Sequence, residues 1–233
     1  MIERYSLSAA AKELAERFRG IAIAGGYTPR YNAAPSQLLP VITNEHPKGF
    51  SFFYWGTAPK WSRNKTISRK LINAEKEELQ EKPTYRKSLA ASRCLVPADG
   101  FYAWKNIGKK SRIPHRIILN NARPFFMAGL WEEYQDNSDE IIHTFLIITV
   151  PANDLIAPVT ERMPAILSDD NESEWLTPRI STDALLGMLQ PFPSEKMGMY
   201  TVSPMIDSFQ LDSPSMVKPA PPVDQFGNFT LFN

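Results

Sequence analysis

The chain has 233 residues, of which 43% are hydrophobic and 22% charged, a composition typical of globular proteins with a real hydrophobic core. Its net charge of +1 argues against a protein that coats nucleic acid by bulk electrostatics, and no apolar run approaches the roughly 18 residues of a membrane span. The N-terminus lacks the apolar segment of a signal peptide, and a single cysteine excludes an internal disulfide, so we expect a cytoplasmic protein.

The predicted elements begin with a helix at residues 8–19, where apolar side chains recur at three- and four-residue spacing. Short runs of β-type residues follow, and two segments that open with capping side chains are predicted to be helices. The strands are expected at 38–43, 50–55, 115–120, 124–130 and 144–150, and the helices at 169–176 and 181–190. The proline-rich tail is expected to be extended or wrapped over the surface. This pattern indicates one α+β domain, residues 1–233, dominated by a mixed or antiparallel sheet.

The run RCLVPADGFYAWK at 93–105 stands out among these elements. It begins as a buried strand, is expected to turn tightly at Asp99-Gly100, and then presents the aromatic residues Phe101, Tyr102 and Trp104. Between the last two aromatics, where a polar group would be expected at a reactive site, the chain has Ala103.

Basic residues gather in two stretches, 60–70 and 105–116, with an acidic stretch at 75–81 between them. Aromatic residues lie in or beside the basic stretches: Trp55, Trp61, Phe101, Tyr102 and Trp104. Cations that follow phosphates, together with aromatic faces that stack on bases, are typical of single-stranded nucleic acid binding. The alternative is that these aromatic side chains belong to the core and that the charges only face solvent.

Other chemistries find no support in the sequence. It has no phosphate-binding glycine loop, HExxH, CxxC pair or GxSxG, and we expect no cofactor. One cysteine and three scattered histidines, His46, His115 and His143, argue against a structural zinc site, and we expect no metal. Cys94, in an apolar strand, is expected to be a buried structural thiol and not a nucleophile.

Seven sequence blocks, in their order along the chain, resemble the SRAP family of SOS-response-associated peptidases, or abasic-site processing proteins. They are RYNAAP (30–35), YWGTAPKW (54–61), LINAE (71–75), RCLVPADGFYAWK (93–105), FFMAGLW (125–131), FLIIT (145–149) and ERMPAIL (161–167). The resemblance covers nearly the whole chain. It implies a single SRAP-type domain with a barrel-like sheet core and flanking helices.

The resemblance also implies a reaction. Family members usually begin Met-Cys-Gly-Arg, and removal of the methionine leaves a cysteine whose amine and thiol attack the aldehyde of an abasic site in single-stranded DNA. A stable thiazolidine ring forms. A glutamate and a histidine serve the proton transfers, and an asparagine orients the reacting groups. The same cysteine is held to remove a short leader peptide in members that carry one.

At the matching positions this sequence departs from the family. Ile2 stands where the cysteine is expected, and its size predicts that Met1 is retained. Asn73 matches the family asparagine, whereas Ala103 replaces the glutamate and Thr160 replaces the histidine. The resemblance therefore predicts a vacated catalytic site.

The expected DNA contacts are changed as well. Glu75 lies where the family typically has an arginine that holds a DNA phosphate, so an attraction becomes a repulsion, whereas Arg162 and Pro164 match the family. The retained candidates for DNA binding are Trp55, Trp61, Trp104, Thr149, Arg162, Lys60 and Arg63. The alternative is that Asn73 only satisfies buried backbone groups and that Arg162 only pairs with Glu161.

Three functions follow from these residues. The first is a catalytically degenerate protein that binds single-stranded or abasic DNA without crosslinking to it. The second is an active crosslinking protein or peptidase that uses substituted groups, such as an N-terminal amine, Glu161 or Glu75. The third is a scaffold repurposed to bind a small ligand or a protein, which the acidic stretch at 75–81 favours. None of the three involves a membrane or a metal.

Overall fold

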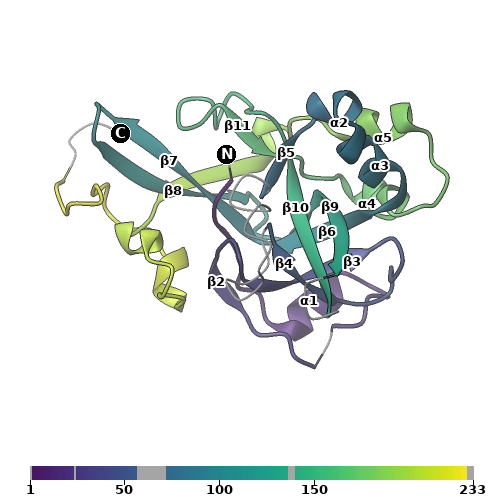
Figure 1. The fold of residues 1–233 in the computed structure, drawn as a ribbon. Helices are drawn as coiled ribbons and strands as arrows, with labels where there is room; N and C mark the ends of the chain where they lie inside the picture. The colour runs from purple at the N-terminus through teal and green to yellow at the C-terminus, as the bar shows by residue number, and fades with distance from the viewer. Residues whose placement is uncertain (1, 24, 57–71, 136–139, 230–233) are drawn as a thin grey trace.

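The computed structural model describes residues 2–23, 25–56, 72–135 and 140–229, and its centre is a closed five-stranded barrel (Figure 1). The barrel strands are β3 (Leu38–Thr43), β4 (Ser51–Trp55), β6 (Arg93–Ala98), β9 (Phe125–Gln135) and β10 (Ile141–Pro151). They follow one another in the order β10-β4-β3-β6-β9, and β9 pairs back onto β10 to close the ring. Only the β10–β4 pairing is parallel among these five. The expected α+β class with a mixed, barrel-like sheet is confirmed.

Two short strands lengthen the barrel wall beside the second half of β10. β5 (Asn73–Glu75) runs parallel to β10 and places Asn73 opposite Ile147. β11 (Arg162–Pro164) runs antiparallel to β10 and places Arg162 opposite Pro151. Two sequence blocks that lie almost 90 positions apart thus meet on either side of one strand.

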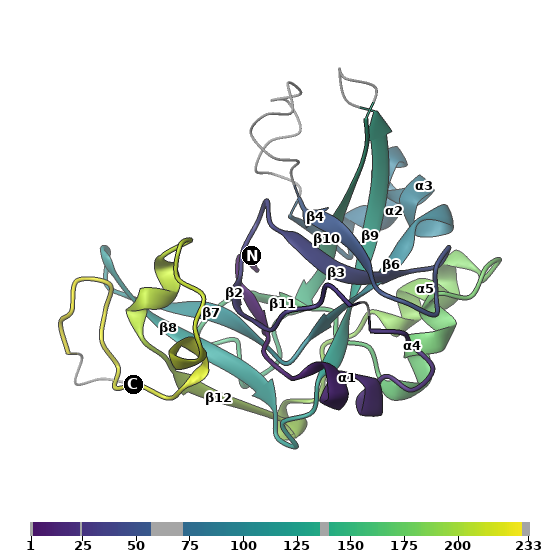
Figure 2. The same cartoon turned by 90° about the horizontal axis from the view of Figure 1, so that it is seen from below.

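A second, antiparallel sheet has the order β12-β8-β7-β1-β2. Its strands are β12 (Met197–Thr201), β8 (Ser111–Leu119), β7 (Gly100–Ile107), β1 (Tyr5–Leu7) and β2 (Arg30–Ala33). The β7–β8 hairpin extends away from the barrel (Figure 2). The strand predicted at 115–120 is therefore only the second half of β8, because the basic residues that precede it also lie in the hairpin.

The expected tight turn at Asp99-Gly100 is wrong in its details. β6 ends at Ala98 and β7 begins at Gly100, so Asp99 alone forms a bend at which the chain leaves the barrel and enters the second sheet. The two strands are not paired with each other as a hairpin would require. The aromatic residues after the bend consequently belong to a different sheet from the strand before it.

The described parts of the chain contain five α-helices: α1 (Ala11–Arg17), α2 (Glu78–Glu81), α3 (Pro83–Ala91), α4 (Asp169–Trp175) and α5 (Thr182–Met188). The predicted helices at 8–19, 169–176 and 181–190 are confirmed, although each is shorter than expected. Helices α2 and α3 were not predicted. Helices α2 to α5 lie on the side of the barrel away from the hairpin (Figures 1 and 2).

The hydrophobic core has two parts. The main cluster fills the barrel and extends to the inner face of the second sheet, and a smaller cluster on the other face of β7 consists of Tyr102, Val202, Ile206 and Met216. The smaller cluster fastens the C-terminal tail, with its short 3-10 helices η2 (Pro204–Asp207) and η3 (Pro214–Val217), beside the hairpin (Figure 2). Another 3-10 helix, η1 (Ser194–Lys196), directly precedes β12. The expected wrapped tail is thus confirmed. No helix in the described ranges is long and apolar enough to cross a membrane.

Candidate functional site

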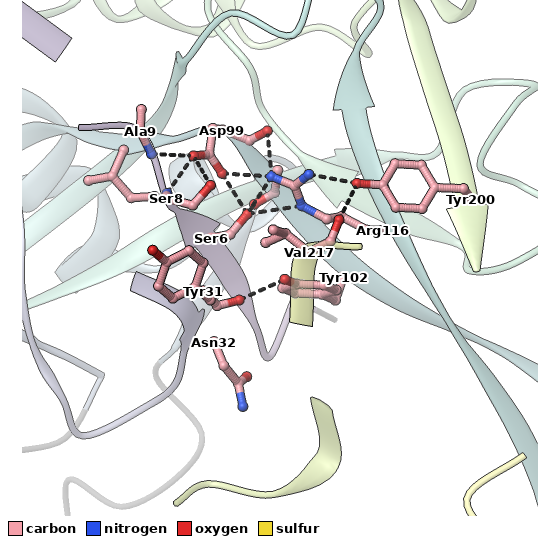
Figure 3. A network of polar contacts seen from close by, with 12 residues as sticks. Ser6, Ser8, Ala9, Tyr31, Asn32, Asp99, Tyr102, Arg116, Tyr200 and Val217 are labelled. Atoms are coloured by element: carbon pink, nitrogen blue, oxygen red, sulfur yellow. Dashed lines mark hydrogen bonds and ion pairs between the residues drawn. The ribbon is translucent and has the colours of Figure 1, made fainter. Parts of the chain in front are cut away.

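A buried carboxylate holds the N-terminal segment against the second sheet (Figure 3). Asp99 is 7% exposed, and its Oδ2 accepts hydrogen bonds from the N–H groups of Ser8 and Ala9 and from the Ser8 hydroxyl at 2.8 Å. Its Oδ1 accepts from the Ser6 hydroxyl at 2.6 Å and from Arg116 Nη2 at 2.8 Å. Charge-assisted bonds of this kind satisfy both buried ions, so the first residues of the chain are fixed in place.

The same network reaches the C-terminal tail through Arg116. Its Nη1 donates to the Tyr200 hydroxyl at 2.7 Å, and that hydroxyl donates to the Val217 carbonyl at 2.8 Å (Figure 3). A Cβ atom at position 100 would lie 2.7 Å from Arg116 Nε, so Gly100 leaves room for the guanidinium. The N-terminus, the hairpin and the tail therefore share one polar anchor.

Two of the predicted site positions are in direct contact. The Asn73 Nδ2 donates to the Ile2 carbonyl at 2.8 Å, and the Ile2 side chain is fully buried in the main core. The Asn73 Oδ1 is buried and accepts no hydrogen bond from the described residues. The asparagine amide thus holds the backbone of the residue at which the family nucleophile is expected.

Ala103, at the expected glutamate position, is 4% exposed and lies opposite His115 in the β7–β8 pairing. Directly opposed residues of an antiparallel pair project from the same face of a sheet, so the imidazole is the neighbour of the alanine methyl group. Burial lowers the pKa of His115, while a hydrogen bond between its Nδ1 and the Ile113 carbonyl at 3.0 Å has the opposite effect. The sequence analysis counted this histidine but missed its place beside Ala103, which strand register alone reveals.

Thr160, at the expected histidine position, is half-buried at the end of the loop that joins β10 to β11. Its N–H donates to the Ile156 carbonyl at 3.1 Å, which closes a turn of this loop. Two residues further on, the chain enters β11 at Arg162.

Arg162 is held by acidic side chains from β5 and the turn after it. Its Nη2 lies 2.8 Å from Glu77 Oε2, and its Nη1 lies 3.6 Å from Glu75 Oε2. It also donates to the Thr149 carbonyl at 2.7 Å and to the Thr149 hydroxyl at 3.0 Å. The alternative that Arg162 pairs with Glu161 is wrong in its partner, because the two carboxylates come from the opposite side of β10.

The other candidate DNA contacts fall into different environments. Trp55 is fully buried, donates from Nε1 to the Ile72 carbonyl at 2.9 Å, and packs edge-to-face against Tyr5. Neither face of that indole is open to a base in this conformation. Trp104 is half-buried, and the Arg112 guanidinium lies 5.1 Å from its ring centroid. Trp61, Lys60 and Arg63 lie outside the described residues.

Cys94 is fully buried in the barrel wall, as expected for a structural thiol. Burial raises the pKa of its thiol far above the usual range, so the reactive thiolate does not form near neutral pH. A Cβ atom at Gly129 would lie 2.8 Å from the Cys94 sulfur, so β6 and β9 pack closely here. Within the described ranges, no three His, Cys, Asp or Glu side chains gather in a way that could hold a metal ion.

Comparisons with known proteins agree with the sequence blocks. A family model described as SOS response associated peptidase (SRAP) matches residues 1–209. The chain is 40% identical to the abasic site processing protein YoqW of Bacillus subtilis (strain 168) over 196 residues, which are 83% of this chain and 88% of the relative. It is 25% identical to the abasic site processing protein HMCES of Rattus norvegicus, with coverage of 83% and 66%. A crystal structure of a protein from Bacteroides thetaiotaomicron superimposes with a TM-score of 0.82 at 28% identity, covering 93% of this chain and 99% of that one.

Proposed function

Because this chain belongs to the SRAP family, we propose that it is a catalytically degenerate member that binds single-stranded or damaged DNA without crosslinking to it. One observation carries the proposal: hydrocarbon side chains, both buried, occupy the positions of the family nucleophile and of the family glutamate. These are Ile2, whose carbonyl is held by Asn73, and Ala103 on β7.

The chemistry that these positions can support is correspondingly limited. Closing a thiazolidine on an aldehyde needs a thiol and an amine on the same residue, and Ile2 has no thiol. A general acid or base must lie within hydrogen-bond reach of the proton that it transfers, and the methyl group of Ala103 carries no such proton. Asn73 donates a hydrogen bond to the carbonyl of residue 2, so this asparagine can orient the backbone there although the side chain carries no reactive group.

A second candidate function is a scaffold repurposed for a small ligand or a protein. The ion pairs of Arg162 with Glu77 and Glu75 favour it, because they compensate an arginine that the family resemblance assigns to DNA. Phosphates would have to compete with two carboxylates for this guanidinium. Under this second function, binding of DNA would be undetectable.

The test of the proposal is a denaturing gel of the protein after incubation with a single-stranded oligonucleotide that carries one abasic site. A strand without the abasic site and a family member with an N-terminal cysteine serve as controls. We expect no shifted band for this protein and a stable band for the cysteine-bearing relative. A stable band specific to the abasic strand would show that an active crosslinking site has been rebuilt from other residues.

Fluorescence anisotropy under native conditions then separates the two non-covalent functions. DNA binding predicts an affinity for labelled single strands that falls as salt concentration rises, because bound phosphates release counterions. Absence of binding at low salt would favour the repurposed scaffold.

A further inference from the structure

One segment of the C-terminal tail is held rigidly, and yet it exposes a large aromatic side chain. The buried Asn32 donates from Nδ2 to the Ser208 carbonyl at 2.8 Å and to the Leu211 carbonyl at 2.9 Å. The Asn32 N–H in turn donates to Asp212 Oδ1 at 3.0 Å. Between these anchors, Phe209 is 65% exposed. Its ring is therefore presented to solvent by a segment that is bonded to β2 on both sides.

The exposed ring lies over a buried cation. The Arg4 guanidinium carbon is 4.0 Å from the centroid of Phe209, and Arg4 is 4% exposed. Its Nη1 donates to the Glu3 carbonyl at 2.7 Å, whereas its Nε is buried and donates to none of the described residues. No carboxylate in the described ranges lies within ion-pair distance of this guanidinium. A buried charge without a paired ion is costly, so an anion that approached it would be attracted.

A second pair of ring and guanidinium lies on the neighbouring hairpin. The Arg112 guanidinium is 5.1 Å from the ring centroid of Trp104, and the Arg112 side chain is 42% exposed. The Trp104 Nε1 is buried and has no acceptor among the described residues. Arg112 also pairs with Asp207 Oδ1 at 3.0 Å, which ties the hairpin to the start of the tail segment. Asp207 is thus shared by the two guanidinium groups, and Glu3 also acts electrostatically on Arg4.

Both pairs lie beside β7, on which Trp104 projects from the face opposite to Ala103. The Tyr102 N–H donates to the Arg4 carbonyl at 3.1 Å, so Arg4 and β7 are bonded side by side. Arg4 is two residues from Ile2 along the chain, and Trp104 directly follows Ala103. A strand that lies along the face of β7 opposite to Ala103 would therefore meet these side chains.

We propose that Phe209, Arg4, Trp104 and Arg112 form a platform for single-stranded nucleic acid, with one base stacked on the exposed face of Phe209, the buried Arg4 guanidinium behind that ring, and an adjacent phosphate at Arg112. Sequence-tolerant binding of single strands needs this combination of aromatic faces and cations, and a cation behind a ring strengthens the site further. The platform deepens the proposed non-covalent binding of DNA and rests on it. It differs from that proposal in placing a contact on the C-terminal tail.

The experiment compares two labelled strands of equal length by fluorescence anisotropy: oligo-dT, and a strand in which tetrahydrofuran spacers replace every base. Both carry the same phosphates, so only the first can stack. Phe209→Ala is the test variant. Ile141→Ala is its control, because Ile141 is similarly exposed, at 62%, but begins the barrel strand β10.

We expect Phe209→Ala to weaken oligo-dT binding about tenfold, which corresponds to about 1.4 kcal/mol, and to leave binding of the spacer strand unchanged. Ile141→Ala should alter neither. Arg112→Gln should weaken the binding of both strands. It should also reduce the slope of log affinity against log salt by about 0.7, the value for one phosphate contact on a single strand.

The outcomes separate this platform from the proposed function. If the wild-type protein binds oligo-dT and Phe209→Ala binds it equally well, the platform is overturned while non-covalent DNA binding stands. If the wild-type protein binds neither strand, both are overturned. If Phe209→Ala also weakened the binding of the spacer strand, which has no bases, that result would contradict stacking on this ring.

Discussion

Glu75 and Glu77 reduce the attraction of Arg162 for an anionic ligand. The Arg162 side chain is 19% exposed, and its guanidinium forms ion pairs with two half-exposed side chains, Glu75 and Glu77. Half-exposed ion pairs contribute only a fraction of a kcal/mol, but their carboxylates also repel any phosphate that approaches. The sequence therefore contains Arg162, but in the structure the positive charge of its guanidinium is compensated by the two carboxylates.

Removing one of these carboxylates should improve binding of single-stranded DNA. We expect Glu75→Gln to raise the affinity for oligo-dT about threefold at low salt, because one repulsive charge is lost and one competitor for Arg162 is removed. Glu81→Gln is the matched control, since Glu81 is an exposed residue at the end of α2 in the same acidic stretch. An equal increase in both variants would indicate a general charge effect and would contradict a specific role of position 75.

The buried imidazole of His115 makes the free energy of unfolding depend on pH. It is 8% exposed beside Ala103, and burial lowers its pKa. The folded protein therefore binds fewer protons than the unfolded chain once the pH falls below about 6.5, the ordinary pKa of histidine. Stability is lost on acidification through this range and recovered above it.

We expect the urea midpoint of the wild-type protein to fall between pH 7.5 and pH 5.5 by more than that of His115→Gln, which cannot be protonated. His143→Gln provides the control, because His143 is more exposed and lies 3.1 Å from Glu133. Identical pH dependence in His115→Gln and in the wild-type protein would show that this imidazole does not contribute.

At the scale of elements, one buried arginine donates hydrogen bonds to carbonyl groups at the C-terminal ends of two helices. Arg93, at the start of β6, is 1% exposed and donates to the Leu89 and Ala90 carbonyls in α3. It also donates to the carbonyls of Trp175, the last residue of α4, and Thr177 just beyond it. The last carbonyls of a helix have no partner within the helix, so a guanidinium can satisfy the ends of both at once.

Replacing this arginine should destabilise the whole fold. We expect Arg93→Met to lower the free energy of unfolding by about 3 kcal/mol, because several buried carbonyls lose their donor at once. Arg86→Met, an exposed position on α3, should change it by less than about 0.5 kcal/mol. Chemical denaturation measures both, and equal effects of the two substitutions would rule out the capping role.

At the scale of the whole molecule, the barrel and the second sheet are joined where β6 becomes β7. Asp99 at that point bonds the N-terminal segment and Arg116, and through Tyr200 the network extends to the C-terminal tail (Figure 3). Residues near both ends of the chain are thereby bonded to the second sheet. The network therefore holds the two ends of the fold together without any contribution from the side chains of Ile2, Ala103 or Thr160.

Much of this architecture was predictable from local sequence. Strand β3 was predicted at its observed bounds and β4 nearly so, because buried strands read as short apolar runs bounded by turn residues. Helices α2 and α3 were missed, because their residues are mainly charged and polar and the packing of Leu79, Tyr85 and Leu89 gives only a weak periodic signal. Helix ends were overestimated because capping signals place a boundary only to within a few residues.

The sequence by itself determined the family and the α+β class, and it predicts replaced groups at Ile2, Ala103 and Thr160, since each depends on residues at fixed positions within recognisable blocks. Only the tertiary structure decided the neighbours of those positions. The pairing of Arg162 with Glu77 and the position of Phe209 over Arg4 join residues that are far apart along the chain. Such contacts arise from strand register and from the path of the tail, and neither leaves a local pattern that a sequence can display.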